Sequence, residues 1–224
     1  MFPFRVINQE TTEDVLDMAS VIQVVEQAYQ MKSSQQATLF PLIFHEFVEG
    51  RADMDIKSGH LPQADVFGLK LVSWFGENDK KGLPQLVGTV MVLDSQTGVP
   101  QGILSGEHIT CMRTGAAGGI GAKYLARRES ENLLIVGTGH QAPFQIMATL
   151  MTMTEIKRVY ICNPRSPEKA QSFATNRCPT ILMNIRVTAR PSNNVGEPRT
   201  LTPTTATPLH TPTFNTPTFN HSGD

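Results

Sequence analysis

The feature that most limits the possible folds is a strand–turn–helix–strand pattern in the second half of the chain. The apolar run Leu133–Val136 leads directly into Gly137-Thr-Gly-His-Gln-Ala142. A helix-like stretch to about Met153 follows, and then a second apolar run, Arg158–Cys162. Two strands joined through one helix are the repeating unit of a doubly wound α/β sheet. The pattern therefore predicts the opening of a Rossmann-type fold.

The glycines in this turn suit a dinucleotide. Gly137 allows the tight turn, Gly139 lets a pyrophosphate approach the backbone, and Ala142 lets the helix pack closely against the strand. Backbone N–H groups at the start of the helix then face the phosphates. A strand, turn and helix without any ligand is the alternative, since short glycine patterns arise by chance. We favour the dinucleotide because the turn lies between two strands in a unit of about thirty residues.

The end of the second strand bears on the choice between NAD and NADP. An acidic residue commonly stands there to bind the ribose 2′-hydroxyl, but Cys162-Asn-Pro164 contains none. Arg165 comes next, and its guanidinium suits a 2′-phosphate. This favours NADP over NAD, unless Arg165 is only a solvated loop charge. Ser166 is the expected N-cap of another helix, with Pro167 as its first residue.

The first half of the chain carries short patterns of helix and strand. A helix is expected from Ser20, as N-cap, to about Met31. Strand-like runs follow at Phe40–Phe47, Val66–Phe75, Leu86–Leu93 and near Ile103. Consecutive strands joined by tight turns indicate a mostly antiparallel sheet. Residues 1–109 are therefore predicted to form a mostly antiparallel α+β N-terminal domain.

A glycine- and alanine-rich segment, residues 110–130, is expected to be a helix that connects this domain to the next. Each glycine costs a helix about 1 kcal/mol relative to alanine. A helix that keeps several is therefore usually packed closely against another backbone or a ligand. Residues 131–174 then form the predicted partial Rossmann domain.

The chain changes character after residue 174. Residues 175–224 contain two acidic residues, seven prolines and twelve threonines, and Thr-Pro-Thr-Phe-Asn occurs twice. Such a composition buries too little apolar surface to offset the entropy of ordering, so a largely disordered, low-complexity tail is expected. The predicted fold class is α/β: an antiparallel α+β domain, an incomplete Rossmann-type domain and a disordered tail.

Composition argues against several classes of partner. A net charge of −1 over 224 residues provides no electrostatic basis for binding nucleic acid or an anionic membrane. No apolar run approaches the ~20 residues that a membrane span needs, and the N-terminus lacks the pattern of a signal peptide. The three cysteines are too dispersed for a disulfide framework or a zinc site: Cys111, Cys162 and Cys178. We therefore expect a cytoplasmic protein without a metal site.

Lys70 is the most notable residue of the N-terminal half. Period-2 alternation within Val66–Phe75 places it on one face with Val72 and Trp74. A lysine in this setting is often an edge residue with its amine in water. The functional alternative is a partly buried ammonium that binds a substrate carboxylate or transfers a proton with a lowered pKa.

Arg113 stands at the head of the glycine- and alanine-rich segment, where a guanidinium can clamp a carboxylate or a phosphate. Weaker candidates, each more easily explained as a surface or structural residue, are His45, Lys57 and His60. His108 and Cys111 lack partners at the spacing that metal binding or nucleophilic catalysis needs. Lys70 and Arg113 are therefore the predicted catalytic residues.

Several segments, in order and spacing, resemble the ornithine cyclodeaminase/mu-crystallin family. The resemblance covers roughly residues 12 to 174. The matching segments are Gly68-Leu-Lys-Leu-Val72, Thr89-Val-Met-Val-Leu-Asp94 with Thr97-Gly98, Ile109–Ala117, Ala122–Ala126 and Gly137–Ala142.

The resemblance implies an NAD(P)-dependent enzyme acting on a small amino or imino acid, such as a cyclodeaminase, an alanine dehydrogenase or a ketimine reductase. It also implies that residues 1–109 bind substrate and form a homodimer. Lys70 and Arg113 would contact the substrate carboxylate or the cofactor. The implied cofactor-binding residues are Thr114, Gly137, Thr138, Gly139, His140, Gln141 and Ala142, with Arg165 and Ser166 at the adenosine ribose.

The chain departs from the family pattern in two places. The family commonly has an arginine for the substrate carboxylate in its first strand, where Ile43 stands here. Lys57 or His45 would then compensate, or the substrate differs. The later Rossmann strands, a catalytic aspartate and a closing helix are not recognisable; Thr205-Ala-Thr-Pro208 faintly resembles one later loop. The alternative function is a truncated, catalytically inactive relative that at most binds nucleotide or a partner subunit.

Overall fold

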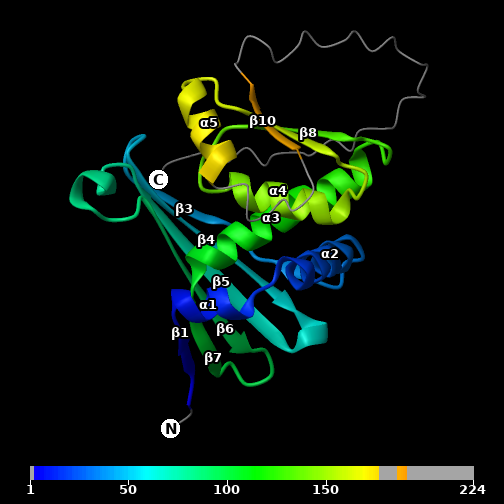
Figure 1. Cartoon of the computed structure of the whole chain (residues 1–224). Helices are drawn as coiled ribbons and strands as arrows, with labels where there is room; N and C mark the ends of the chain where they lie inside the picture. The colour runs from blue at the N-terminus through cyan, green and yellow to red at the C-terminus, as the bar shows by residue number, and fades with distance from the viewer. Residues whose placement is uncertain (1–2, 177–185, 191–224) are drawn as a thin grey trace, which may run out of the picture.

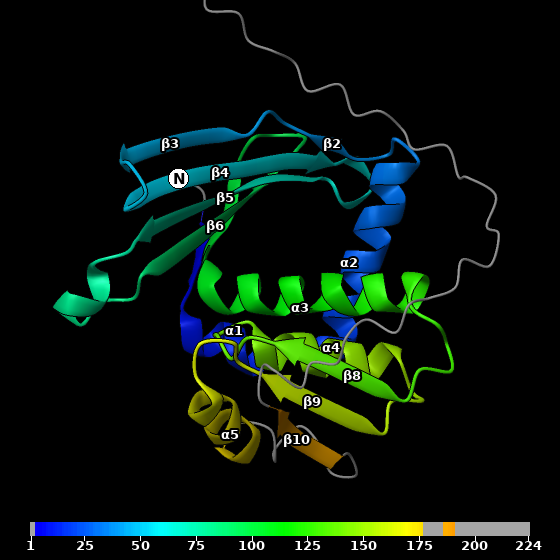
Figure 2. The ribbon, with the colours of Figure 1, turned by 90° about the horizontal axis from the view of Figure 1, so that it is seen from above.

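A computed structural model describes residues 3–176 and 186–190 of the chain. These residues form a seven-stranded sheet and a three-stranded sheet with helices packed between them (Figures 1 and 2). Seen from above, helix α3 lies between the larger sheet and helix α4, and the smaller sheet lies beyond α4 (Figure 2). None of the helices in the described ranges is long and apolar enough to cross a membrane.

The seven-stranded sheet is mostly antiparallel, as predicted. Its strand order is β1-β7-β6-β5-β4-β2, with β3 also paired to β4, and only β1 and β7 pair in parallel. The strands are β1 (Arg5–Ile7), β2 (Thr38–Leu39), β3 (Ile43–Val48), β4 (Ala52–Leu61), β5 (Val66–Phe75), β6 (Leu86–Asp94) and β7 (Pro100–Ser105). Short 3-10 turns at Pro62–Ala64 and Asn78–Lys81 follow β4 and β5.

Strand β4 was missed by the sequence patterns. It carries Asp53, Asp55 and Lys57 on one face, where strand patterns lead one to expect apolar residues. Helices α1 (Gln9–Val15) and α2 (Met18–Ser33) precede the sheet. The predicted N-cap of α2 is wrong: Asp17, not Ser20, caps the helix, because its carboxylate accepts the Ser20 N–H at 2.9 Å.

Helix α3 (Gly106–Leu125) packs along helix α4 (Ala142–Thr152) at very short range. A Cβ added at Gly115 would lie 2.6 Å from the Phe144 carbonyl oxygen, and one at Gly119 would lie 2.7 Å from that of Ala148. The expectation that this helix keeps its glycines for close backbone packing is therefore confirmed. The close approach sets α3 between the two sheets.

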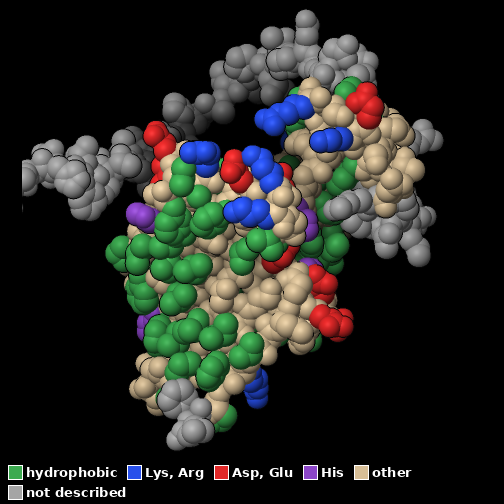
Figure 3. Space-filling view, turned by 90° about the vertical axis from the view of Figure 1, so that its left-hand side faces the viewer, with side chains coloured by type: hydrophobic (Ala, Val, Ile, Leu, Met, Phe, Trp, Pro, Cys, Tyr) green, Lys and Arg blue, Asp and Glu red, His purple; other side chains and the backbone are tan. Residues whose placement is uncertain are grey.

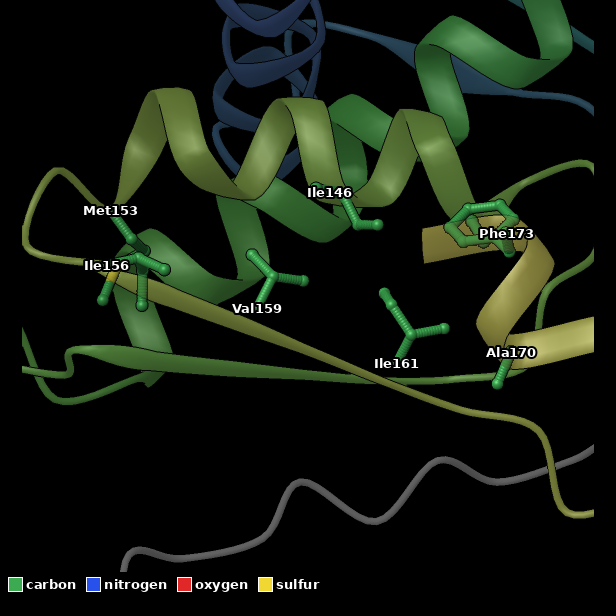
Figure 4. Close-up of a cluster of buried hydrophobic side chains, with 8 residues drawn as sticks. Ile146, Met153, Ile156, Val159, Ile161, Ala170 and Phe173 are labelled. Atoms are coloured by element: carbon green, nitrogen blue, oxygen red, sulfur yellow. The ribbon is translucent and has the colours of Figure 1, made fainter. Parts of the chain in front are cut away.

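The smaller sheet is parallel, with the order β10-β9-β8. Its elements are β8 (Asn132–Val136), β9 (Arg158–Cys162), helix α5 (Pro167–Asn176) and β10 (Arg186–Arg190). Apolar side chains from α4, β9 and α5 form its core, including Ile146, Val159 and Ile161, all fully buried (Figure 4). This βαβαβ arrangement confirms the predicted Rossmann-type opening.

Two expectations about the end of the chain need correction. Residues 186–190 were assigned to a disordered tail, but they form β10, the third parallel strand. Helix α5 also continues to Asn176, beyond the predicted boundary at residue 174. The strand was not expected because prolines and threonines dominate the composition of residues 175–224. The Thr-Pro-Thr-Phe-Asn repeats and residues 205–212 lie outside the described residues.

Candidate functional site

The glycine turn, residues 137–142, connects β8 to α4 and also contacts the end of the neighbouring parallel strand, β9. Gly137 has a φ of +108°, which residues with a Cβ rarely adopt. Its N–H donates to the Cys162 carbonyl at 2.7 Å. Asn163 Nδ2 donates to the Thr138 hydroxyl, also at 2.7 Å. The turns after β8 and β9 are therefore tied together at the carboxyl edge of the sheet, where open α/β sheets bind ligands.

Open space surrounds the second glycine of the turn. A Cβ added at Gly139 would meet no atom within 4 Å. Two cavities flank the turn: one of about 370 Å³ between the turn and α5, and one of about 300 Å³ beside β8 and the start of α4. A ligand can therefore approach the backbone of Gly139 closely.

Asn163 is a site residue that the sequence analysis missed. Its Oδ1 accepts the N–H groups of Arg165 at 3.1 Å and Ser166 at 3.2 Å, in addition to the Nδ2 contact with Thr138. The available signal was an asparagine followed by proline, which favours a turn held by the asparagine side chain. Ser166 caps α5 as predicted, because its Oγ accepts the Lys169 N–H at 3.3 Å. Arg165 is exposed.

The first half of α3 connects the glycine turn to the larger sheet. Lys70 Nζ of β5 lies 3.3 Å from the Thr110 hydroxyl of this helix. Gln141 Nε2 of the glycine turn lies 3.5 Å from the Cys111 sulfur, one residue further along. The predicted substrate residue Lys70 and the predicted cofactor residue Gln141 therefore contact neighbouring positions of one helix. Thr114 is held one turn later, where Gln145 Nε2 donates to its carbonyl at 2.9 Å.

Lys70 lies in the interior of the larger sheet. Its strand pairs with β4 and β6, and Lys70 stands opposite Lys57 and Val90. It is therefore not an edge residue, and its side chain is half-buried. Burial lowers the pKa of the Lys70 ammonium from 10.5 to about 8, and the charges of Arg113 and Lys57 act in the same direction.

The charges of Lys57, Arg113 and Asp55 all act on Lys70, although Arg113 is exposed and lines a different cavity, of about 440 Å³, beside α1 and α2. Lys57 Nζ contacts Asp55 Oδ2 at 2.5 Å, and the Asp55 charge partly offsets the lowering of the Lys70 pKa. Asp55 Oδ1 is buried without a hydrogen-bond partner among the described residues. Lys57 and Lys70 line a cavity of about 430 Å³ beside the sheet. The excess of positive charge favours a small anion such as a carboxylate.

His60 lines the same cavity as Lys57 and Lys70. The remaining histidine candidates lie apart from it. His45 of β3 is exposed and packs edge-on against Phe47, and His108 packs edge-on against Phe144. His140 of the glycine turn lies 3.9 Å from a Glu107 carboxylate oxygen. Within residues 3–176 and 186–190, no three His, Cys, Asp or Glu side chains are grouped as a metal site would require.

The segments that build this site lie within a match to one known family. The model of the ornithine cyclodeaminase/mu-crystallin family matches residues 5–218. The chain belongs to this family. Lys70, Arg113 and the glycine turn all fall within the matched residues.

Named relatives of this family resemble the chain in sequence. Alanine dehydrogenase of Archaeoglobus fulgidus is 32% identical over 77% of this chain and 52% of its own length. Delta(1)-pyrroline-2-carboxylate reductase of Bacillus cereus is 41% identical over 49% of this chain and 33% of its own length. The chain thus spans about half, or less, of the curated relatives it matches.

Solved structures share the fold. Thermococcus litoralis Delta(1)-pyrroline-2-carboxylate reductase, in complex with NADH and L-proline, has a TM-score of 0.77 at 28% identity. An archaeal alanine dehydrogenase dimer with bound NAD has a TM-score of 0.77 at 30% identity. Each comparison covers 84% of this chain, with 57% and 56% of the solved chains respectively. The predicted α/β fold and family are therefore confirmed.

Proposed function

We propose that the chain functions as an NAD(P)-dependent oxidoreductase or cyclodeaminase on a small amino or imino acid. The observation that carries the proposal is the first half of α3, which contacts Lys70 through Thr110 and the glycine turn through Cys111. A site for a carboxylate and a site for a dinucleotide therefore meet on one helix. The named relatives, a dehydrogenase and a reductase of amino and imino acids, support the same conclusion.

The residues of the glycine turn fit a dinucleotide. The positive φ of Gly137 and the open space beside Gly139 allow a pyrophosphate to approach the backbone. In this proposal, residues 137–142 and Thr114 hold the cofactor, and Arg165 with Ser166 lies at the adenosine ribose. The end of β9 has no acidic residue to bind the ribose 2′-hydroxyl of NAD, and Arg165 follows it. This supports a preference for NADP over NAD.

A bound nicotinamide supplies or accepts a hydride. Held by residues 137–142, it would deliver this hydride to an imine carbon in the reductive direction, and the substrate nitrogen would take up a proton. Lys70 and Arg113 hold the substrate carboxylate through charge-assisted hydrogen bonds. With a pKa of about 8, Lys70 is mostly protonated at neutral pH, so its proton is available either to the carboxylate or to the substrate nitrogen.

The test of this function is a fluorescence titration with NADH and NADPH. We expect the wild-type chain to bind both, and Gly139→Asp to weaken both by more than about tenfold, because a like charge placed beside the pyrophosphate costs several kcal/mol. A Cβ at Gly139 meets open space, so the fold should tolerate the change, which thermal unfolding checks. Unchanged affinity in Gly139→Asp would contradict the proposed site.

We further propose a homodimer formed through the N-terminal domain, and a cytoplasmic location. The dimer is supported by the exposed apolar residues of β2 and β3. Figure 3 shows hydrophobic side chains gathered over one side of the molecule. The archaeal alanine dehydrogenase neighbour is itself a dimer. The location is supported by the thiols of Cys111 and Cys162, which are free and buried. Nucleotide binding without turnover would favour the alternative, an inactive relative.

A further inference from the structure

We propose that Lys169 of α5 binds the pyrophosphate of the dinucleotide, supplying charge that the start of α4 lacks. The inference rests on the proposed function, since it names a further residue of the same cofactor site. Lys169 lies outside both the glycine turn, residues 137–142, and the turn that follows β9, residues 163–166, so neither motif indicates it.

The cavity beside the glycine turn carries the first part of the argument. One wall of this 370 Å³ cavity is the turn itself, at Thr138, Gly139 and His140. The other wall is a single face of α5, formed by residues 169, 172, 173 and 176 at helical spacing. Of the described residues that line it, Lys169 alone is a lysine or arginine, and its side chain is exposed. Among the described residues it makes no ion pair.

The start of α4 carries the second part. In most dinucleotide folds, free N–H groups at this helix terminus bind the pyrophosphate. Here the Ala142 N–H already donates to the Gly139 carbonyl at 3.1 Å, and Pro143 at the next position has no N–H. Of the first three residues of α4, all described, only Phe144 keeps an N–H without a backbone partner. The first three residues of α4 therefore offer a bound dianion a single free N–H, and the Lys169 ammonium supplies charge that this helix start lacks.

Lys169 and Arg165 lie in different parts of the proposed cofactor site. The Asn163 side chain fixes the backbone of Arg165 and Ser166 in the turn after β9, on the ribose side. Lys169 lies one helical turn further on and faces the glycine turn instead. Arg165 is not among the described residues that line this cavity. The two cations are thus placed for different phosphates, Lys169 for the pyrophosphate and Arg165 for a 2′-phosphate.

The experiment measures dissociation constants by calorimetry for NADH, NADPH and adenosine. We expect Lys169→Ala to weaken NADH and NADPH equally, by about tenfold, as the loss of one charge-assisted hydrogen bond predicts. Adenosine, which has no phosphate, should bind Lys169→Ala as it binds the wild type. Lys169→Arg should restore most of the lost affinity, and Arg165→Ala should weaken NADPH alone.

Lys157→Ala is the matched control, because it removes the same charge from the opposite end of β9, where Lys157 pairs with Glu131. Dinucleotide affinity in Lys169→Ala equal to that in Lys157→Ala would overturn the inference. A loss confined to NADPH would also overturn it, by placing Lys169 at the 2′-phosphate. If the wild type binds neither dinucleotide, the proposed function itself fails. Thermal unfolding of the ligand-free variants separates these outcomes from a damaged fold.

Discussion

At the scale of single residues, the proton on Lys70 links burial to ligand binding. Because its pKa lies at about 8, the ammonium is protonated below that pH and neutral above it. A carboxylate is attracted only by the protonated form, so its affinity should be full below pH 8 and fall as the pH rises through that value. We therefore expect the dissociation constant of pyruvate, measured with NADH present, to rise as the pH passes through 8, since pyruvate has no group that titrates in this range.

Two variants of Lys70 identify the group responsible. Lys70→Met should weaken pyruvate binding at pH 7 by about tenfold and remove its pH dependence, because the charge is gone. Lys70→Arg should keep the binding and lose the dependence, because a guanidinium stays protonated throughout. A pH dependence that survives in Lys70→Met would assign the titration to another group.

At the scale of elements, the contact between α3 and α4 depends on particular glycines. Gly115→Ala would place a Cβ 2.6 Å from the Phe144 carbonyl oxygen, which is backbone and cannot simply turn away. We expect the free energy of unfolding in urea to fall by about 1–3 kcal/mol, the usual cost of overpacking. Gly121 of the same helix has open space at its Cβ position. Gly121→Ala should therefore raise stability by up to about 1 kcal/mol through helix propensity alone.

The same pair of variants tests whether α3 positions the site. Thr110, Cys111 and Thr114 lie in the turn beside Gly115, so separating α3 from α4 should also move the Lys70 and Gln141 contacts. Gly115→Ala is expected to weaken NADH binding, whereas Gly121→Ala should leave it unchanged. Equal stability of the two variants would show that the helices can move apart without cost.

At the scale of the whole molecule, exposed apolar surface favours self-association. On β3, side chains toward both faces of the strand are exposed, with Ile43 at 54% and Phe44 at 60%. Such a surface is typical of an interface. We expect a dimer in sedimentation velocity at micromolar concentration, and a monomer for the double variant Ile43→Asp, Phe44→Asp, because two buried carboxylates would be unpaired there.

Strand β8 provides the comparison for this prediction. In the described part of the chain it pairs only with β9, and Leu134 is exposed on the face turned away from the core. Leu134→Asp should leave the dimer intact if the interface lies on β3. Dissociation by Leu134→Asp, with the β3 variant still dimeric, would place the interface on the parallel sheet instead.

Local pattern alone determined much of this protein. The apolar runs of β8 and β9, the glycines between them and the Ser166-Pro167 helix start were all predictable, because each depends on neighbours in sequence. The face on which Lys70 lies followed from the period of a strand. Strand β4 could not be found this way, because Asp53, Asp55 and Lys57 on one of its faces remove the apolar alternation.

Tertiary structure decided the rest, because it brings together groups that are distant in sequence. Lys70 is interior rather than at an edge only because β4 pairs beside it, and its lowered pKa depends on that burial and on Arg113 from α3. Likewise, Lys169 faces the glycine turn only because α5 packs across the same parallel strands as α4. The residue types and their periods specify each element, whereas burial and charge at the site arise from the packing of elements against one another.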